Sequence, residues 1–123
     1  MQAARRILIV EDDPDIRAAL ASAMSEAGAE VLLAEDGVAA LAQLRNGPRP
    51  AVVLLDLRLP RLGGEGFLAE MRADPKFERL PVITMTAGAG SVPGDDIVAR
   101  LHKPFDFEDL RRIVESLFDA PTL

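Results

Sequence analysis

Charged and hydroxyl side chains follow four separate apolar runs of this sequence. The acidic triplet Glu11 to Asp13 follows the first run, Asp56 follows another, and Thr86 and Lys103 follow two later ones. Crowded carboxylates repel one another, and the physical remedies are raised pKa values, a neighbouring lysine or a divalent cation with oxygen ligands. Magnesium suits two carboxylates completed by waters. If folding gathers these residues, their types predict a magnesium site.

Asp56 is the residue of this set that could act as an oxygen nucleophile. A carboxylate that attacks a phosphoryl group forms an aspartyl phosphate. The negative charges of that product need cations, and Lys103 supplies an ammonium group while Thr86 supplies a hydroxyl donor. The pattern therefore predicts a phosphoryl group on Asp56, held between the metal on one side and the lysine on the other.

Each of these residues also has an ordinary structural interpretation. An aspartate after a buried strand often forms a turn, and one acid of the triplet could cap a helix that begins at Pro14, which would contribute about 0.3–1 kcal/mol. A lone threonine or lysine beside a loop is usually structural or solvated. His102, the single histidine, fits a strand residue better than a phosphocarrier. The chemical interpretation depends on the residues meeting in one pocket.

Apolar runs that are typical of strands recur along the chain. Two of them, 7–10 and 51–55, are uninterrupted, as in strands buried on both faces. Further strands are predicted over 31–34, 82–85 and 100–102. The run-to-run spacing is short, and helical patterns lie between the runs. Alternation of this kind predicts right-handed crossovers in a parallel sheet.

Helix signals occupy most of the gaps between the predicted strands. Pro14 suits the first turn of one helix, Asp36 opens a second, Phe67 lies on the apolar face of a third, and Asp106 caps the last. The fold class is therefore an open, doubly wound α/β sandwich. In such sheets, ligands bind beyond the carboxyl ends of the strands. The acids, the hydroxyl and the ammonium group should meet at that edge.

The composition restricts the possible functions. The 123 residues fit one domain over 1–123, with a core over about 5–119. A formal net charge of -6 argues against nucleic-acid binding through clustered cations, so we expect no direct nucleic-acid contact. The sequence has no cysteine and no apolar run of about 18 residues. We therefore expect a cytoplasmic protein without membrane insertion.

Four motifs resemble, in order and over essentially the whole chain, the receiver domains of bacterial two-component response regulators. The motifs are the acidic cluster of 7–13, the acceptor loop from Leu55 to Gly64, Thr86 with Ala87, and Lys103-Pro104-Phe105. The resemblance implies a flavodoxin-like three-layer sandwich with a five-stranded parallel sheet in the order 2-1-3-4-5. It also implies phosphorelay signalling that changes the binding of a downstream partner.

The resemblance assigns a role to individual residues. Asp56 matches the phosphoacceptor, and Thr86 and Lys103 match the two side chains that bind the phosphoryl group. Mg²⁺ would be held by Glu11, Asp12, Asp56 and the backbone carbonyl of Arg58. The phosphoryl donor would be a sensor histidine kinase or a histidine phosphotransfer protein, and the domain would catalyse its own phosphorylation and slow dephosphorylation without being a conventional enzyme. The downstream protein is not identified by any motif.

Two features depart from the receiver pattern. The segment between Thr86 and Lys103 is several residues shorter than usual, and 87–94 holds three glycines and one proline. We therefore expect a shortened or irregular fourth helix that starts near Asp95. Arg100 stands at the switch position, where receivers usually place a rotating aromatic residue. Both departures predict retained chemistry and altered signalling.

Three other functions fit the sequence less well. A pseudo-receiver would keep the fold and act by binding alone, but the set of site residues is complete. A phosphatase with an aspartate nucleophile usually places a second aspartate two residues on, where this chain has Arg58. A flavin protein of similar architecture would need a phosphate-binding loop and stacking aromatic residues, whereas this chain has no Trp and no Tyr.

Overall fold

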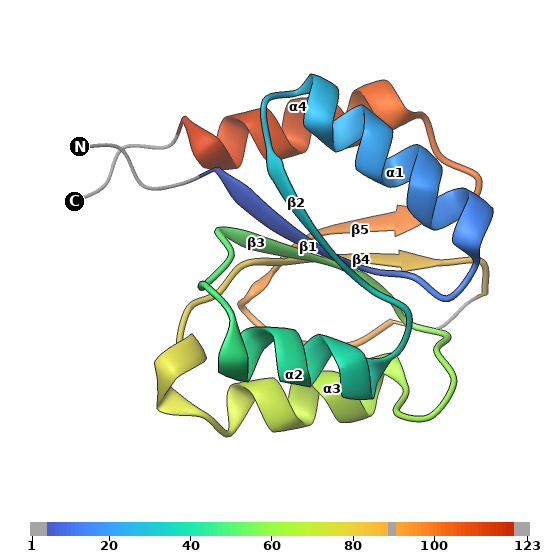
Figure 1. The fold of residues 1–123 in the computed structure, drawn as a ribbon. Helices are drawn as coiled ribbons and strands as arrows, with labels where there is room; N and C mark the ends of the chain where they lie inside the picture. The colour runs from blue at the N-terminus through green and yellow to red at the C-terminus, as the bar shows by residue number, and fades with distance from the viewer. Residues whose placement is uncertain (1–4, 89–90, 120–123) are drawn as a thin grey trace.

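A computed structural model describes residues 5–88 and 91–119 of the chain. Five parallel strands form one sheet in the order β2-β1-β3-β4-β5, as predicted (Figure 1). The strands are β1 (Arg6–Val10), β2 (Glu30–Ala34), β3 (Val52–Asp56), β4 (Val82–Thr86) and β5 (Ile97–His102). The helices are α1 (Pro14–Glu26), α2 (Gly37–Asn46), α3 (Gly64–Arg72) and α4 (Phe107–Phe118), and a short 3-10 helix η1 (Pro75–Phe77) follows α3. None of the helices in the described ranges is long and apolar enough to cross a membrane.

Helices cover both faces of the sheet, which confirms the three-layer sandwich. Helices α1 and α4 lie on one face, and α2 and α3 lie on the other (Figure 1). Leu20 of α1 and Leu110 of α4 belong to one buried cluster, whereas Leu41 of α2 and Phe67 of α3 belong to the second. The sheet therefore separates two hydrophobic cores.

The central strands are apolar throughout because their alternate side chains enter different cores. In β1, Ile7 and Ile9 pack with α1 and α4, and Leu8 and Val10 pack with α2 and α3. All four are fully buried. Burying such side chains contributes about 1.5–3 kcal/mol each. The β1 and β3 strands are therefore the rigid base from which the polar residues at the strand ends project.

The parallel register brings the carboxyl ends of the strands to one edge of the sheet. Val10 is paired with Leu55, Asp56 with Met85, and Thr86 with His102. The residues that follow β1, β3, β4 and β5 therefore emerge side by side. This register explains how side chains more than ninety positions apart in sequence, such as Glu11 and Lys103, come within contact distance.

Three aspartates begin helices at this same edge. The side chain of Asp13 accepts hydrogen bonds from two backbone N–H groups of α1, Asp36 accepts one from α2, and Asp106 accepts one from α4. Such caps satisfy donors that have no partner within the helix. The cap predicted at Asp106 is confirmed, and Asp36, predicted to open its helix, also proves to cap it. Asp13, the third acid of the triplet, also serves the helix.

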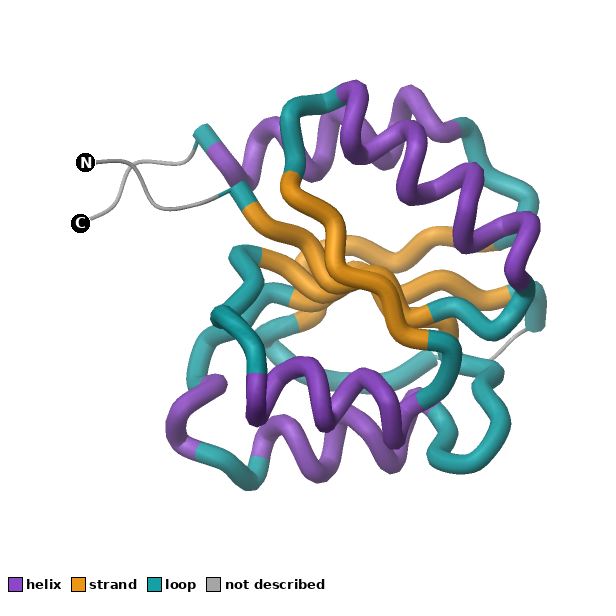
Figure 2. The backbone as a smooth tube through the Cα atoms, in the orientation of Figure 1, coloured by secondary structure: helices purple, strands orange, loops and turns teal. Residues whose placement is uncertain are grey.

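The connection between β4 and β5 is irregular, and the short helix expected near Asp95 is not formed in the described residues (Figure 2). The N–H of Ile97 donates to Gly94 O at 3.2 Å, and Asp96 O accepts from Val82 N–H at 2.8 Å. A turn therefore leads directly into the sheet and leaves no length for a helix. Strand β5 accordingly begins at Ile97 and not at Arg100, because the β-branched residues there extend it.

Residues 91–96 form an extended segment, the β4–β5 strap, that is attached to the rest of the molecule at several points. Val92 is buried in the core shared with α2 and α3. The Arg72 guanidinium of α3 donates to Pro93 O at 2.9 Å and makes two hydrogen bonds to the Asp96 carboxylate. Arg100 of β5 donates to Val92 O at 3.1 Å. Side chains from a helix and a strand thus fix the strap in place of regular helical hydrogen bonds.

Candidate functional site

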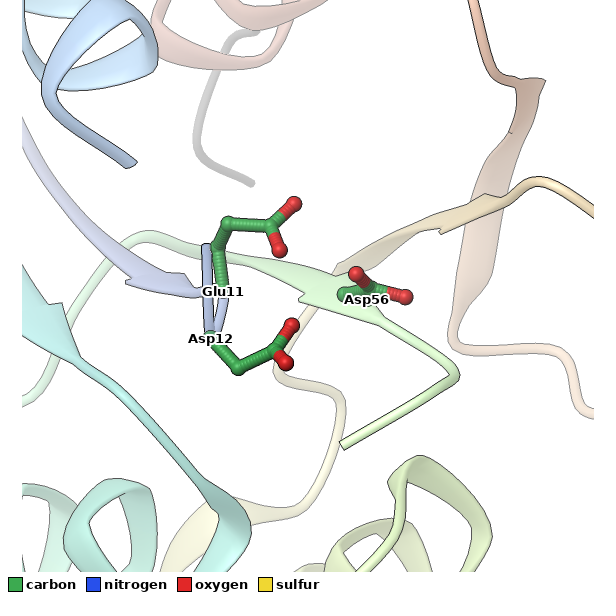
Figure 3. A group of neighbouring side chains, drawn as sticks. All are labelled: Glu11, Asp12 and Asp56. Atoms are coloured by element: carbon green, nitrogen blue, oxygen red, sulfur yellow. The ribbon is translucent and has the colours of Figure 1, made fainter. Parts of the chain in front are cut away.

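Three carboxylates gather at the edge where the strands end. Glu11 and Asp12 follow β1, and Asp56 is the last residue of β3. Each offers an oxygen, and these three oxygens lie within 4.8 Å of one another. Figure 3 shows the Glu11 and Asp12 side chains directed to the side on which Asp56 lies. Glu11 and Asp56 are buried, whereas Asp12 is exposed, so the cluster opens to solvent on one side.

The Lys103 ammonium group lies between two of these carboxylates. Its Nζ donates to Glu11 Oε1 at 2.6 Å and to Asp56 Oδ2 at 2.8 Å. The backbone N–H of Lys103 donates to Thr86 O at 2.8 Å, which continues the β4–β5 ladder past the end of β5. The lysine is therefore held by its backbone as well as by its side chain. The convergence predicted for the acids and the lysine is observed.

Thr86 ends β4 and lies next to the same edge. Its side chain is largely buried, and Oγ1 accepts a hydrogen bond from the Gly88 N–H at 3.1 Å. Thr86 lines a cavity of about 320 Å³ together with Arg58 and Gly64. The hydroxyl hydrogen of Thr86 can still be donated, because the recorded bond uses only the oxygen as an acceptor. Thr86 thus faces a space beside the end of β3.

The backbone of Arg58 fixes the orientation of the Asp56 carboxylate. The Arg58 N–H donates to Asp56 Oδ1 at 2.9 Å, while Oδ2 accepts from Lys103. The two carboxylate oxygens therefore have different partners. The Arg58 guanidinium extends over Gly88, where a Cβ atom would lie 2.9 Å from Arg58 Nη2. Its charged end therefore lies by the loop after β4. The metal-ligand role of the Arg58 carbonyl stays a prediction.

Burial and charge act against each other at this site. Burial raises the pKa of Glu11, the Lys103 hydrogen bond lowers it, and the neighbouring Asp56 carboxylate raises it further, with a raised pKa as the net result. Burial alone would lower the pKa of Lys103, but the hydrogen bonds to Asp56 and Glu11 outweigh burial and raise it. A cation with a fixed charge is therefore held beside carboxylates that repel one another.

The donor set fits a magnesium ion. All three donors are carboxylate oxygens, which hard cations prefer, and one carboxylate is open to solvent so that waters could complete the coordination. Two of the three acids are already compensated by Lys103. A dication would add positive charge to a cluster in which one lysine faces three carboxylates. The residues therefore suit a metal bound by a few carboxylates and several waters.

Arg17 is a residue of this region that sequence reasoning missed. Its Nη1 atom donates to Glu11 O at 2.9 Å and to Asp12 O at 3.4 Å. Nothing in the sequence distinguishes Arg17 from the other exposed-face arginines of the chain. The one sequence signal for this contact is that Arg17 follows Glu11 by only six residues, across a short loop and the first turn of a helix.

Arg100, the predicted switch residue, lies on β5 opposite Thr84 of β4. Its recorded hydrogen bond goes to the carbonyl of Val92 in the β4–β5 strap. Within the part of the chain that the structure describes, no hydrogen bond joins Arg100 to Thr86. Arg100 is therefore engaged with the strap, and its role in switching stays a prediction.

Comparison with known proteins finds relatives along almost the whole chain. The family described as the response regulator receiver domain matches residues 7–115. The chain is 39% identical over 104 residues to protein Rrf1 of Nitratidesulfovibrio vulgaris (strain Hildenborough), which covers 82% of this chain and 73% of Rrf1. It is 34% identical over 102 residues to response regulator Rcp1 of Synechocystis sp. (strain PCC 6803), which covers 72% of this chain and 67% of Rcp1.

A solved structure shows the same arrangement of elements. The crystal structure of the receiver domain of sensor histidine kinase PA1611 from Pseudomonas aeruginosa PAO1 matches with a TM-score of 0.82 at 31% identity. The match covers 96% of this chain and 100% of that domain. In that crystal structure a magnesium ion is coordinated in the active site cleft. The acidic cluster described above occupies the strand-end edge of the same fold.

Proposed function

This chain belongs to the response regulator receiver domain family, and on that basis we propose that Asp56 accepts a phosphoryl group from the phosphohistidine of a partner. Members of this family are signalling modules of two-component systems that interact with histidine kinases, and they are not conventional enzymes. The specific partner here would be a sensor histidine kinase or a histidine phosphotransfer protein. Phosphorylation would then change the binding of a downstream protein.

The contact that supports this proposal most strongly is the double hydrogen bond of Lys103. Its ammonium group touches both Glu11 and Asp56, at 2.6 and 2.8 Å. This one ammonium group therefore joins the acid after β1 to the acid that ends β3. A lysine shared by two buried acids, with the third acid Asp12 in the same cluster, is suited to a site where negative charge is added during a reaction.

In the proposed reaction, an Asp56 carboxylate oxygen attacks phosphorus, and the bond from phosphorus to the donor imidazole nitrogen breaks. The electron pair of that bond stays on the imidazole nitrogen. Glu11, Asp12, Asp56 and the Arg58 carbonyl would hold Mg²⁺, which when bound supplies charge compensation for the phosphoryl oxygens. The Arg58 N–H, 2.9 Å from Asp56 Oδ1, keeps the carboxylate in one orientation as it reacts.

Lys103 and Thr86 would bind the transferred group. As the phosphoryl group arrives, the Lys103 ammonium can exchange its carboxylate contact for a phosphoryl oxygen, which develops a stronger negative charge. The Thr86 hydroxyl can donate its hydrogen to a second phosphoryl oxygen, because its recorded hydrogen bond uses the oxygen as an acceptor. Thr86 ends β4 and Lys103 directly follows the neighbouring strand β5.

Dephosphorylation is expected to be slow. An efficient aspartate phosphatase needs a general acid or base near the acyl phosphate, commonly a second aspartate two residues after the first. Here that position is Arg58, which cannot exchange a proton near neutral pH. We therefore expect the domain to catalyse its own phosphorylation and a slow hydrolysis, without turnover of free phosphate esters.

A small phosphodonor tests this proposal. The purified domain is incubated with acetyl phosphate and Mg²⁺, and its intact mass is recorded over time. We expect the wild type to gain the mass of one phosphoryl group, and Asp56→Asn or removal of Mg²⁺ with a chelator to prevent the gain. Asp109→Asn on the exposed face of α4 is the matched control and should behave like wild type. A wild type that never gains this mass would instead favour a binding-only module.

A further inference from the structure

Arg17 of α1 is attached to the loop that carries two of the acids. Its Nη1 donates to Glu11 O at 2.9 Å and to Asp12 O at 3.4 Å. We propose that Arg17 is a positioning residue for the metal: by binding these two consecutive carbonyls, it sets the direction in which the Glu11 and Asp12 carboxylates point. This inference rests on the proposed function, because it assumes that the acidic cluster binds Mg²⁺.

Arg17 is the residue that binds the carbonyl groups of this loop, because the other hydrogen bonds of the loop use its N–H groups and side chains. Glu11 N–H donates to Ala34 O at 3.1 Å, and Asp13 N–H donates to Glu11 Oε2 at 3.2 Å. Asp13 itself is occupied as the cap of α1. These contacts engage N–H groups and side chains. Within residues 5–88 and 91–119, no backbone N–H outside the regular ladders donates to the carbonyl of Glu11 or Asp12.

Fixing these carbonyls restricts the side chains beside them. The direction of a carbonyl is set by the backbone angles at its residue, and those angles also set the direction of the Cα–Cβ bond. Glu11 has an independent anchor in Lys103, at 2.6 Å. Asp12 is exposed, and none of the hydrogen bonds recorded for the described residues involves its carboxylate. Asp12 is therefore the ligand whose placement depends most on Arg17.

The charge of Arg17 and its hydrogen bonds have opposite effects on a metal. Within the described ranges, no carboxylate pairs with the Arg17 guanidinium within 4.0 Å, so its positive charge is not locally cancelled. Taken by itself, this charge repels a dication, and its removal would strengthen metal binding. Loss of the hydrogen bonds would instead loosen the ligands and weaken metal binding. The sign of the change therefore distinguishes a positioning role from a purely electrostatic one.

Calorimetric titration with Mn²⁺ and with Mg²⁺ measures this sign. We expect Arg17→Met, which keeps an unbranched apolar stem without charge or donors, to bind metal about tenfold more weakly than wild type, in line with residues that orient metal ligands. Arg17→Lys keeps the charge but not the guanidinium fork, and should also bind more weakly than wild type. Arg45→Met, at the far end of α2, is the matched control and should leave affinity unchanged.

The metal-free protein provides a second measurement. Amide hydrogen exchange at Asp12 and Asp13 should be faster in Arg17→Met than in wild type, and unchanged in Arg45→Met. If Arg17→Met does not fold, Arg17→Gln, which keeps one donor, takes its place. If Arg17→Met binds metal as tightly as wild type or more tightly, the positioning role of Arg17 is wrong, but the proposed metal site still stands. If the wild type binds no metal and Asp12→Asn behaves in the same way, both this inference and the proposed metal site are wrong.

Discussion

The edge that carries the acids and the β4–β5 strap are built in different ways. Around β1 and β3, buried carboxylates lie close together and share one lysine, an arrangement that opposes folding unless charges are compensated. The strap of residues 91–96 leads from the end of β4 to the opposite edge of the sheet, and it is held by the buried side chain of Val92, by Arg72 of α3 and by Arg100 of β5. The apolar and hydrogen-bonding contacts of the strap stabilise the folded protein. A strand-end site therefore does not require a helix between β4 and β5.

The two regions differ in how much stability is lost when one contact is removed. The acidic cluster contains charged groups that would destabilise the protein if their partner were removed. The strap contains hydrogen bonds at a partly exposed surface, which contribute less and can be removed singly. If the two regions are independent, a substitution in one should leave the properties of the other unchanged.

Removal of the lysine from the acidic cluster should cause the largest loss of stability. Lys103→Met leaves Glu11 and Asp56 buried without their cation, which should lower the free energy of unfolding at neutral pH by about 3 kcal/mol in metal-free protein. Urea unfolding measures this loss. Added Mg²⁺ should recover part of it, because the metal also compensates the acids. Equal stability of wild type and Lys103→Met would show that the cluster is not under electrostatic strain.

Magnesium itself should stabilise the domain through the same acids. If it binds only the folded protein, the free energy of unfolding should rise by about 2.7 kcal/mol at a hundredfold excess over Kd. Asp12→Ala should abolish most of this rise while the domain stays folded. Thermal unfolding over a series of Mg²⁺ concentrations provides the test. A rise that persists in Asp12→Ala would place the metal elsewhere in the molecule.

Arg72→Ala should detach the strap and leave the chemistry unchanged. It removes two hydrogen bonds to Asp96 and one to Pro93 O, at a partly exposed position, so we expect a loss of about 1 kcal/mol. Phosphorylation by acetyl phosphate should proceed as in wild type. Arg45→Ala, which breaks the exposed pair with Glu70, is the control and should lose less. Slower phosphorylation of Arg72→Ala would show that the two regions are coupled.

The same ion pair makes stability depend on pH. The hydrogen bond from Arg72 holds the pKa of Asp96 below its usual 3.8, against the opposing effect of burial. The contribution of this pair is therefore fully present above about pH 4 and is lost as the pH falls through the lower pKa of the folded state. Acid unfolding curves of wild type and Arg72→Ala should converge below pH 4. A constant difference between them would contradict this assignment.

Arg100→Met should have the smallest effect. It removes the hydrogen bond to Val92 O while keeping an unbranched apolar stem, and we expect a loss of about 0.5 kcal/mol. Denaturant unfolding detects a difference of this size when the two proteins are measured together. If Arg100→Met instead changes the rate of phosphorylation, the switch position communicates with Asp56 despite lacking an aromatic residue.

Sequence alone predicts the sheet and most of its polar edge. The runs around β1 and β3 are uninterrupted because both of their faces are buried, and a parallel register then forces the groups after each strand to one side. Asp106 is predictable as a cap because a short acid directly before a helical pattern satisfies free N–H groups. These predictions succeed because each depends on local pattern and on one topological rule.

The remaining features depend on long side chains whose partners lie far away in sequence. Arg72 meets Asp96 across 24 positions, and neither residue type nor spacing indicates that pairing. Arg17 binds backbone carbonyls, which every residue offers. Strand β5 is longer than predicted because the glycines and proline of 87–94 indicate a loop and a short helix, whereas the β-branched Ile97 and Val98 extend the strand. Tertiary contacts decide such cases.

The ion pair between Arg5 and Asp119 brings together the two ends of the described chain. Arg5 Nη2 lies 2.9 Å from Asp119 Oδ1, and the guanidinium also stacks over the Phe118 ring, 5.8 Å from its centroid. Polypeptide joined before the first strand and polypeptide joined after the last helix would thus leave from the same corner. A domain whose ends lie close together can be inserted into a longer protein with little rearrangement of the host chain.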